Sequence, residues 1–224
     1  MWLLLNLVVY MSFAVVPAVV ICGLAGRWDV WNAWAYAGML AALVLFMTLG
    51  NYRTRPDLLK ERLKPSTRGR VRWPSSRAAP VVLILQWIIS GLDQRFHWSD
   101  SVPLAGVVAG LVIVAIGLAL FTWSALVNPF FSSVTRIQED RGQQVISAGP
   151  YRIMRHPAYA GLILGSVAGG LALNSLLSVI PIVVILVPMT VYQMMIEDRM
   201  LRHELAGYAD YAAKVRYRLI PGMW

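Results

Sequence analysis

Chemically useful side chains are concentrated in two polar stretches of an otherwise apolar chain, residues 138–159 and 193–224. The first stretch ends in the run Arg155-His156-Pro157-Ala158-Tyr159, directly before an apolar segment. Proline suits the first turn of a helix, where its missing N–H is no loss. Arg155 and His156 would then lie at a helix N-terminus, where free N–H groups and the helix dipole favour an anion such as a carboxylate. The pattern predicts an anion-binding corner, with Arg155 as a catalytic candidate.

Two simpler interpretations of this corner stay open. Arg155 could contact a lipid phosphate, and His156 could merely cap the helix. A metal site at His156 is disfavoured, because no other His or Cys stands at ligand spacing. The single cysteine, Cys22, lies within an apolar run and excludes a disulfide framework or a cysteine-based zinc site. We therefore expect no metal.

The second polar stretch follows the last apolar segment of the chain. Its acidic, apolar and aromatic residues recur at intervals of four and three, which predicts one stripe of a continuous tail helix: Glu197, Leu201, Glu204, Tyr208 and Tyr211. Asp198 and Arg202 stand four apart with the acid first, which favours an ion pair on a solvated helix. Glu197 differs, because an acid at the end of an apolar span is costly unless it is paired. We predict Glu197 as a second catalytic residue.

The elements that must position these residues are membrane helices. Of the 224 residues, 58% are hydrophobic and only 14% are charged. Six apolar segments cover residues 3–24, 31–50, 79–92, 102–127, 159–173 and 176–196. Four of them have the roughly 20 residues that cross a bilayer core, whereas the third and fifth are short enough to be tilted, incomplete or re-entrant. The expected fold is an all-α polytopic membrane bundle of five to six helices.

Short connections and small residues indicate how the helices pack. Only Asn174-Ser175 separates the fifth segment from the sixth, which predicts a tight helical hairpin. Glycines at four-residue spacing let two helices approach closely in lipid. They occur in the fifth segment (Gly161, Gly165 and Gly169) and in the fourth (Gly106 and Gly110).

Basic residues set the expected orientation. They gather in the loop at 51–78, in the segment after residue 127 and in the tail, whereas the alternate side carries only Arg27 and Arg95. Six spans with both termini and the active site in the cytoplasm satisfy the positive-inside rule. This distribution also argues that the net charge of +9 reflects membrane orientation and not nucleic-acid binding. Residues 1–127 would form four spans with the basic loop, and residues 128–224 the functional core with a cytoplasmic tail helix.

The polar residues resemble those of a known family. The runs Gly149-Pro150-Tyr151 and Arg155-His156-Pro157-Ala158-Tyr159, followed by Glu197-Asp198, Leu201, Tyr208 and Tyr211, are similar in order to the signature of isoprenylcysteine carboxyl methyltransferases. The resemblance covers about two-fifths of the chain and extends to the wider superfamily that includes phospholipid N-methyltransferases. Residues 128–224 would accordingly be a methyltransferase core.

The resemblance implies a cytoplasmic pocket for S-adenosylmethionine, closed by the tail. The positions that match cofactor contacts of the family are Gln138, Gln143, Gln144, Val145, Ile146, Tyr151, His156, Pro157, Ala158, Tyr159 and Glu197. The stretch before Tyr151 is about two residues shorter than in the family, which affects the match of the four positions from Gln143 to Ile146.

One position departs from the family. Where the family has a substrate-contacting arginine, this chain has Gln193, which keeps hydrogen bonding but lacks the charge that holds a carboxylate. Arg216 and Arg218, near the end of the tail, could replace that charge or could contact lipid phosphate. We predict Gln193, Arg216 and Arg218 as substrate-binding residues.

The resemblance implies a lipophilic or lipid acceptor that enters from the membrane, and it favours O-methylation of a carboxylate. A phospholipid N-methyltransferase is the first alternative, because it would keep the cofactor site and change only the acceptor. A small transporter or assembly factor is the second, although transporters usually place polar positions near the midplane of the bilayer. A membrane reductase lacks support, because the chain has no nicotinamide fingerprint.

Overall fold

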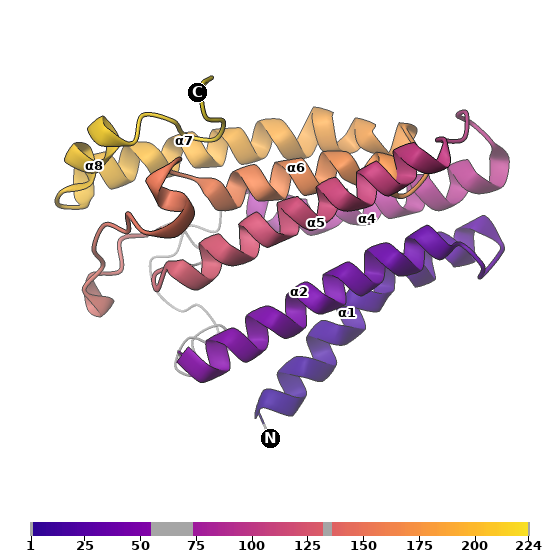
Figure 1. Cartoon of the computed structure of the whole chain (residues 1–224), viewed down its shortest axis with the longest axis horizontal. Helices are drawn as coiled ribbons and strands as arrows, with labels where there is room; N and C mark the ends of the chain where they lie inside the picture. Colours follow the sequence, from indigo (N-terminus) through magenta and orange to yellow (C-terminus); the bar gives the residue numbers. More distant parts are fainter. Residues whose placement is uncertain (1, 55–73, 132–135, 224) are drawn as a thin grey trace.

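The computed structural model describes residues 2–54, 74–131 and 136–223, and the regular elements in this part of the chain are all helical (Figure 1). Its long helices are α1 (Trp2–Ala25), α2 (Trp31–Thr54), α4 (Pro74–Phe96), α5 (Leu104–Val127), α6 (Pro157–Ala172) and α7 (Val187–Glu204). Shorter elements are the 3-10 turns η1 (Glu139–Arg141), η2 (Gly149–Arg152) and η3 (Leu177–Val179), the π-helical η4 (Ile182–Leu186), and α8 (Tyr208–Lys214). The predicted all-α fold is confirmed. Most of the basic loop at 51–78 lies outside the described residues.

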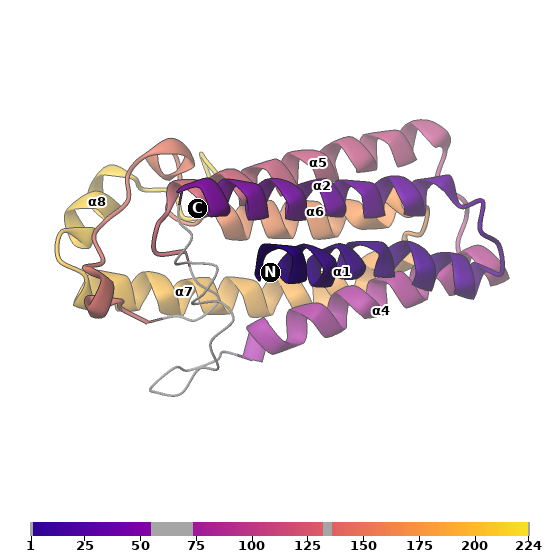
Figure 2. The same cartoon turned by 90° about the horizontal axis from the view of Figure 1, so that it is seen from below.

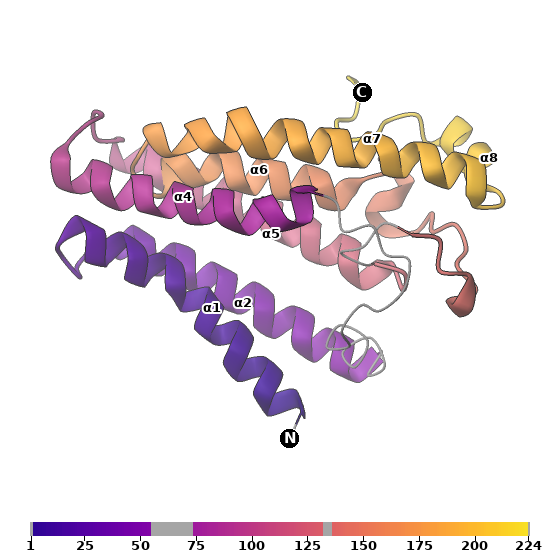
Figure 3. The same cartoon turned by 180° about the vertical axis from the view of Figure 1, so that it is seen from behind.

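The long helices run up and down, so that functional segments far apart in sequence meet at one end. The connections at 26–30, 97–103 and 173–176 lie together at the right in Figure 1, and α8, η1 and the start of α6 lie at the left. The view from behind shows the same separation (Figure 3). Helix α4 packs against α1 and α7, and α2 packs against α5 (Figure 2). At the end that carries α8, the start of α6 lies beside the end of α7.

Among the residues that the structure describes, three helical stretches are long and apolar enough to cross a membrane: Trp31–Gly50, Leu104–Val127 and Leu177–Glu204. Helix α4 is longer than the predicted segment at 79–92. Its 23 residues span about 34 Å, because polar residues at both ends extend the helix beyond its apolar part. Helix α6 remains short at 16 residues. The count of six spans stays a prediction.

The sixth segment is not one regular helix. A 3-10 turn and the π-helical η4 precede α7. Pro188, the second residue of α7, cannot donate a hydrogen bond to the carbonyl four residues earlier, which accounts for the irregular turn before it. The tight hairpin is confirmed: Asn174 adopts a positive φ of 55°, and its side chain accepts a hydrogen bond from the Val102 backbone at 2.7 Å.

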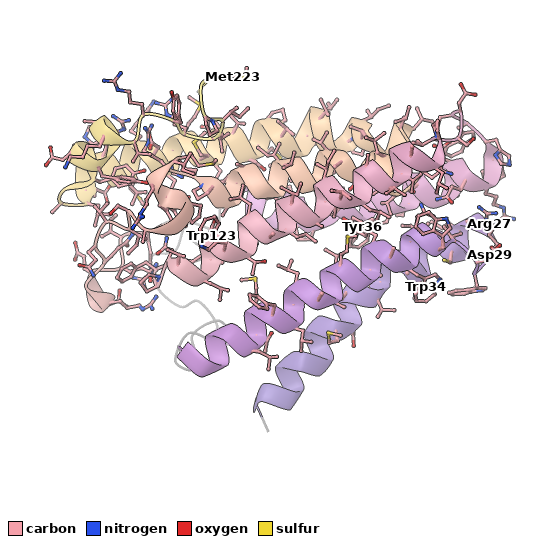
Figure 4. All side chains as sticks on the ribbon, viewed as in Figure 1. Arg27, Asp29, Trp34, Tyr36, Trp123 and Met223 are labelled. Atoms are coloured by element: carbon pink, nitrogen blue, oxygen red, sulfur yellow. The ribbon has the colours of Figure 1, made fainter. Side chains whose placement is uncertain are left out.

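The end that carries the three connections is fixed by buried polar contacts. The Asp93 carboxylate accepts hydrogen bonds from the Ser99 backbone at 2.8 Å and from the Ser175 hydroxyl at 2.5 Å. Exposed tryptophans surround the same end, at positions 28, 31, 34 and 98, with Arg27 and Asp29 nearby (Figure 4). Such aromatic residues are typical of a membrane–water interface.

Helices α5 and α6 pack closely through glycines. A Cβ atom on Gly161 would lie 2.5 Å from the Gly117 carbonyl oxygen, and one on Gly117 would lie 2.7 Å from the Gly161 oxygen. The packing role predicted for the glycines of the fifth segment is confirmed at Gly161, and Gly169 similarly contacts the side chain of Gln86. Gly106, in contrast, has only Val102 within reach.

We expect Gly117→Ala to lower the free energy of unfolding by about 1–3 kcal/mol, because the new methyl group would collide with backbone atoms of α6. Gly38→Ala is the matched control, since a Cβ atom there has nothing within 4 Å. Unfolding by a denaturing detergent, followed by tryptophan fluorescence, measures both. Equal stabilities for the two variants would contradict the close α5–α6 packing.

Candidate functional site

Asp198 is the centre of the polar network at the end of α7. This carboxylate is 2% exposed and contacts five side chains, which come from the start of α6, from α7, from α8 and from the tail. Arg155 donates to it twice, at 2.8 and 3.2 Å, and His156 Nε2 lies 3.2 Å from Oδ1. The other donors are Tyr208 at 3.0 Å, Arg202 at 3.1 Å and Arg218 at 3.3 Å. We call these six residues the Asp198 cluster.

Arg155 joins this cluster to the tail. Its Nη1 donates to the backbone oxygens of Val215 at 2.7 Å and Arg216 at 2.8 Å. The backbone N–H groups of Arg155 and His156 donate to the oxygens of Tyr217 and Arg218, both at 2.9 Å. The predicted anion-binding site at the start of α6 is therefore occupied by a carboxylate of the chain itself, that of Asp198. These contacts favour a positioning role for Arg155, and its catalytic role stays a prediction.

The tail helix is broken, and the prediction of one continuous helix from Glu197 to Tyr211 is wrong. Helix α7 ends at Glu204, Leu205 is extended, and Gly207 adopts a φ of 78° before α8 begins at Tyr208. Only glycine adopts such a φ without strain, so Gly207 allows the chain to turn back.

This turn brings two tyrosines of α8 onto the site. The Tyr211 hydroxyl donates to the Tyr151 backbone oxygen at 2.7 Å, while Tyr208 reaches Asp198. Burial raises the pKa of both hydroxyls, and that of Tyr151 to about 12. All three tyrosines therefore stay protonated near neutral pH and act as hydrogen-bond donors.

A second polar pair lies on a different face of α7. The Tyr159 hydroxyl, in the first turn of α6, donates to the half-buried Glu197 carboxylate at 2.6 Å. Gln193 stands one helical turn before Glu197 and shares its face. Consecutive residues project about 100° apart on a helix, so Asp198 and Glu197 point to different surroundings. In the described part of the chain, no basic side chain forms an ion pair with Glu197.

The loop before η2 is held largely by its own amides. Gln138 is buried; its Nε2 donates to the Phe130 oxygen at 2.6 Å, and its backbone N–H donates to Gln143 Oε1 at 2.7 Å. Val145 packs beneath α8, against Tyr208 and Tyr211.

The structure thus brings together Tyr151, His156, Pro157, Ala158, Tyr159, Gln193 and Glu197 near the α6 N-terminus. Gln144 is exposed, and Ile146 is half-buried in the loop. No local sequence pattern predicts the pairing of Arg155 with Asp198, 43 residues apart, whereas the predicted Asp198–Arg202 pair is confirmed. Among the residues that the structure describes, no group of three His, Cys, Asp or Glu side chains could hold a metal.

Known proteins resemble this chain in two ways. Residues 105–206 match the family model of phospholipid methyltransferases. The fold is similar to the solved structure of a eukaryotic intramembrane Ras methyltransferase, isoprenylcysteine carboxyl methyltransferase, with a TM-score of 0.62 and 17% identity over 95% of this chain and 75% of that one. No curated protein matches the sequence. Both matches agree with the resemblance that the sequence motifs indicated: residues 105–206 are similar to phospholipid methyltransferases, and the fold is similar to that of an intramembrane isoprenylcysteine carboxyl methyltransferase.

Proposed function

We propose that this chain transfers a methyl group from S-adenosylmethionine to a lipophilic acceptor at the membrane surface. The observation that carries the proposal is the Glu197–Tyr159 pair at the end of an apolar span. A half-buried carboxylate without a basic partner in the described residues fits a cationic ligand, since an isolated buried charge is costly. S-adenosylmethionine carries both a sulfonium and an ammonium group.

The side chains around Glu197 also suit the rest of the cofactor. Tyr151 and Tyr159 offer aromatic surface next to Glu197, and aromatic faces attract cations. Gln193 offers an amide on the same face of α7. When bound, S-adenosylmethionine supplies an electrophilic methyl group on a positively charged sulfur. We predict that Tyr151, His156, Tyr159 and Glu197 hold it, with the loop around Gln138 and Val145 as one wall.

The chain's own contribution is positioning and exclusion of water. The Asp198 cluster fixes the start of α6 against the end of α7, and thereby the distance between Tyr159 and Glu197. The tail at 215–218 is bound to Arg155 and His156 and covers this junction. Holding two reactants in line can lower a barrier by several kcal/mol.

We favour a carboxylate acceptor, hence O-methylation. A carboxylate needs no general base, whereas an amine must first lose a proton. N-methylation of a phospholipid is the second candidate, favoured by the phospholipid methyltransferase match and by Gln193 in place of arginine. We retain the predicted orientation, with the site and both termini in the cytoplasm.

The two candidates separate when acceptors with different polar heads are compared. Purified protein in lipid nanodiscs is incubated with methyl-labelled S-adenosylmethionine and a farnesylated cysteine carboxylate, a farnesylated thiol or phosphatidylethanolamine. We expect label in the carboxylate. Label in phosphatidylethanolamine alone would replace O-methylation by the second candidate.

A further inference from the structure

A cavity of about 460 Å³ borders the Asp198 cluster on the side of the tail. Four arginines line it: Arg155, Arg202, Arg216 and Arg218. The described residues that line it include no acidic side chain. Asp198, which lies outside the lining, forms ion pairs with three of these arginines and contributes a single negative charge. The cavity is therefore strongly cationic and has the size of a small-molecule site.

Arginine geometry favours a phosphate in this cavity. A planar guanidinium offers paired N–H donors that match phosphate oxygens, and it stays charged at any physiological pH. Arg216 is exposed and makes no ion pair within the described residues. Arg202 reaches Asp198 through Nε and is itself largely exposed. These two side chains present donors to the cavity from two elements, the end of α7 and the tail.

The surroundings favour a phosphate that belongs to a lipid. The cavity lies where α7 leaves the apolar stretch Leu177–Glu204. The tail that borders it exposes two apolar side chains, Ile220 at 50% and Met223 at 80%, and Met223 projects from the outer surface beside α7 (Figure 4). Exposed apolar groups next to clustered cations suit a phospholipid, which carries a phosphate and a hydrocarbon chain, better than they suit a free anion.

The cavity is separate from the face that carries Glu197. Arg155 and Asp198, both nearly inaccessible, form a buried ion pair at its inner wall. Asp198 and Arg202 share one face of α7, about 100° away from the face of Gln193 and Glu197. We propose that this arginine cavity binds the phosphate of a membrane phospholipid headgroup, as a ligand distinct from the methyl acceptor. For Arg216 and Arg218 this proposal takes the lipid-phosphate alternative in place of the predicted substrate-binding role. Such a lipid bridges α7 and the tail through Arg202 and Arg216.

The test measures binding in the absence of S-adenosylmethionine, so it does not depend on the proposed methyl transfer. Purified protein in a non-ionic detergent is titrated with dioctanoylphosphatidylglycerol, and thermal unfolding reports binding. We expect a saturable stabilisation in the wild-type protein. Arg216→Gln should weaken the apparent affinity about fivefold, which corresponds to the loss of one cationic contact at a membrane surface. Arg202→Gln should weaken it in the same direction.

Arg199→Gln is the matched control, since Arg199 is an exposed arginine of α7 outside the cavity lining. Dioctanoylglycerol, which lacks the phosphate, should not stabilise the protein, and millimolar inorganic phosphate should have little effect. Equal affinities in Arg216→Gln and Arg199→Gln would overturn the site. Inorganic phosphate as effective as the lipid would overturn its assignment to a lipid headgroup.

Discussion

Asp198→Ala is expected to lower the free energy of unfolding by about 3–5 kcal/mol, the usual cost of removing one partner of a buried ion pair. The Arg155 side chain is 2% exposed, so its charge would remain buried without its carboxylate. Tyr208 and Arg218 would lose the same acceptor. Since the cluster binds the tail to α6, the tail at 215–218 should also become accessible to protease.

Detergent-induced unfolding and limited proteolysis measure this effect. Asp210→Ala is the matched control, because Asp210 is an exposed acid on α8. Asp198→Asn, which keeps the shape but loses the charge, should fall between the control and Asp198→Ala. If Asp198→Ala unfolds at the same detergent concentration as Asp210→Ala, the cluster does not hold the tail.

Glu197→Gln should weaken S-adenosylmethionine binding at least about tenfold, or about 1.4 kcal/mol. The substitution keeps the size of the side chain and removes the negative charge that we propose faces the cationic cofactor. Tyr159→Phe removes only the hydroxyl that donates to Glu197, so we expect a smaller loss of severalfold. Isothermal titration calorimetry with the protein in detergent gives both affinities.

Glu204→Gln provides the control for charge alone. Glu204 is an exposed acid at the end of the same helix. Its affinity for S-adenosylmethionine should match that of the wild-type protein. An unchanged affinity in Glu197→Gln as well would remove the placement of the cofactor at the Glu197–Tyr159 pair.

Local rules predicted several elements of the fold correctly. Pro157 marked the first turn of a helix, and α6 begins at this residue. Asn174-Ser175 marked the hairpin. The glycine spacing identified Gly161 as a packing position but not its partner Gly117, which stands seven residues after Gly110 and outside the four-residue pattern. A contact between two helices depends on both sequences, and spacing within one of them describes only half of it.

The candidate site shows the same limit. The pairing of Asp198 with Arg202 follows from helical spacing, but Arg155 and Tyr208 join it through the tertiary fold. Periodicity predicted a continuous helix through Tyr211, because the apolar and aromatic stripe continues past Gly207. The tyrosines of this stripe pack with Ile137 and Val145 of the loop, and Tyr211 donates to the Tyr151 oxygen of η2, only because the chain turns at Gly207. The proximity of Tyr159 to Glu197 was expected from the family resemblance and not from any local pattern.

The most direct test of the account is methyl transfer itself. Purified wild-type protein is incubated with radiolabelled S-adenosylmethionine and a total lipid extract, and the label in the organic phase is counted. We expect time-dependent labelling that is lost in Glu197→Gln and kept in Glu204→Gln. Label that stays in the aqueous phase at every protein and lipid concentration, with a folded protein, would contradict the assignment of methyltransferase activity to this site.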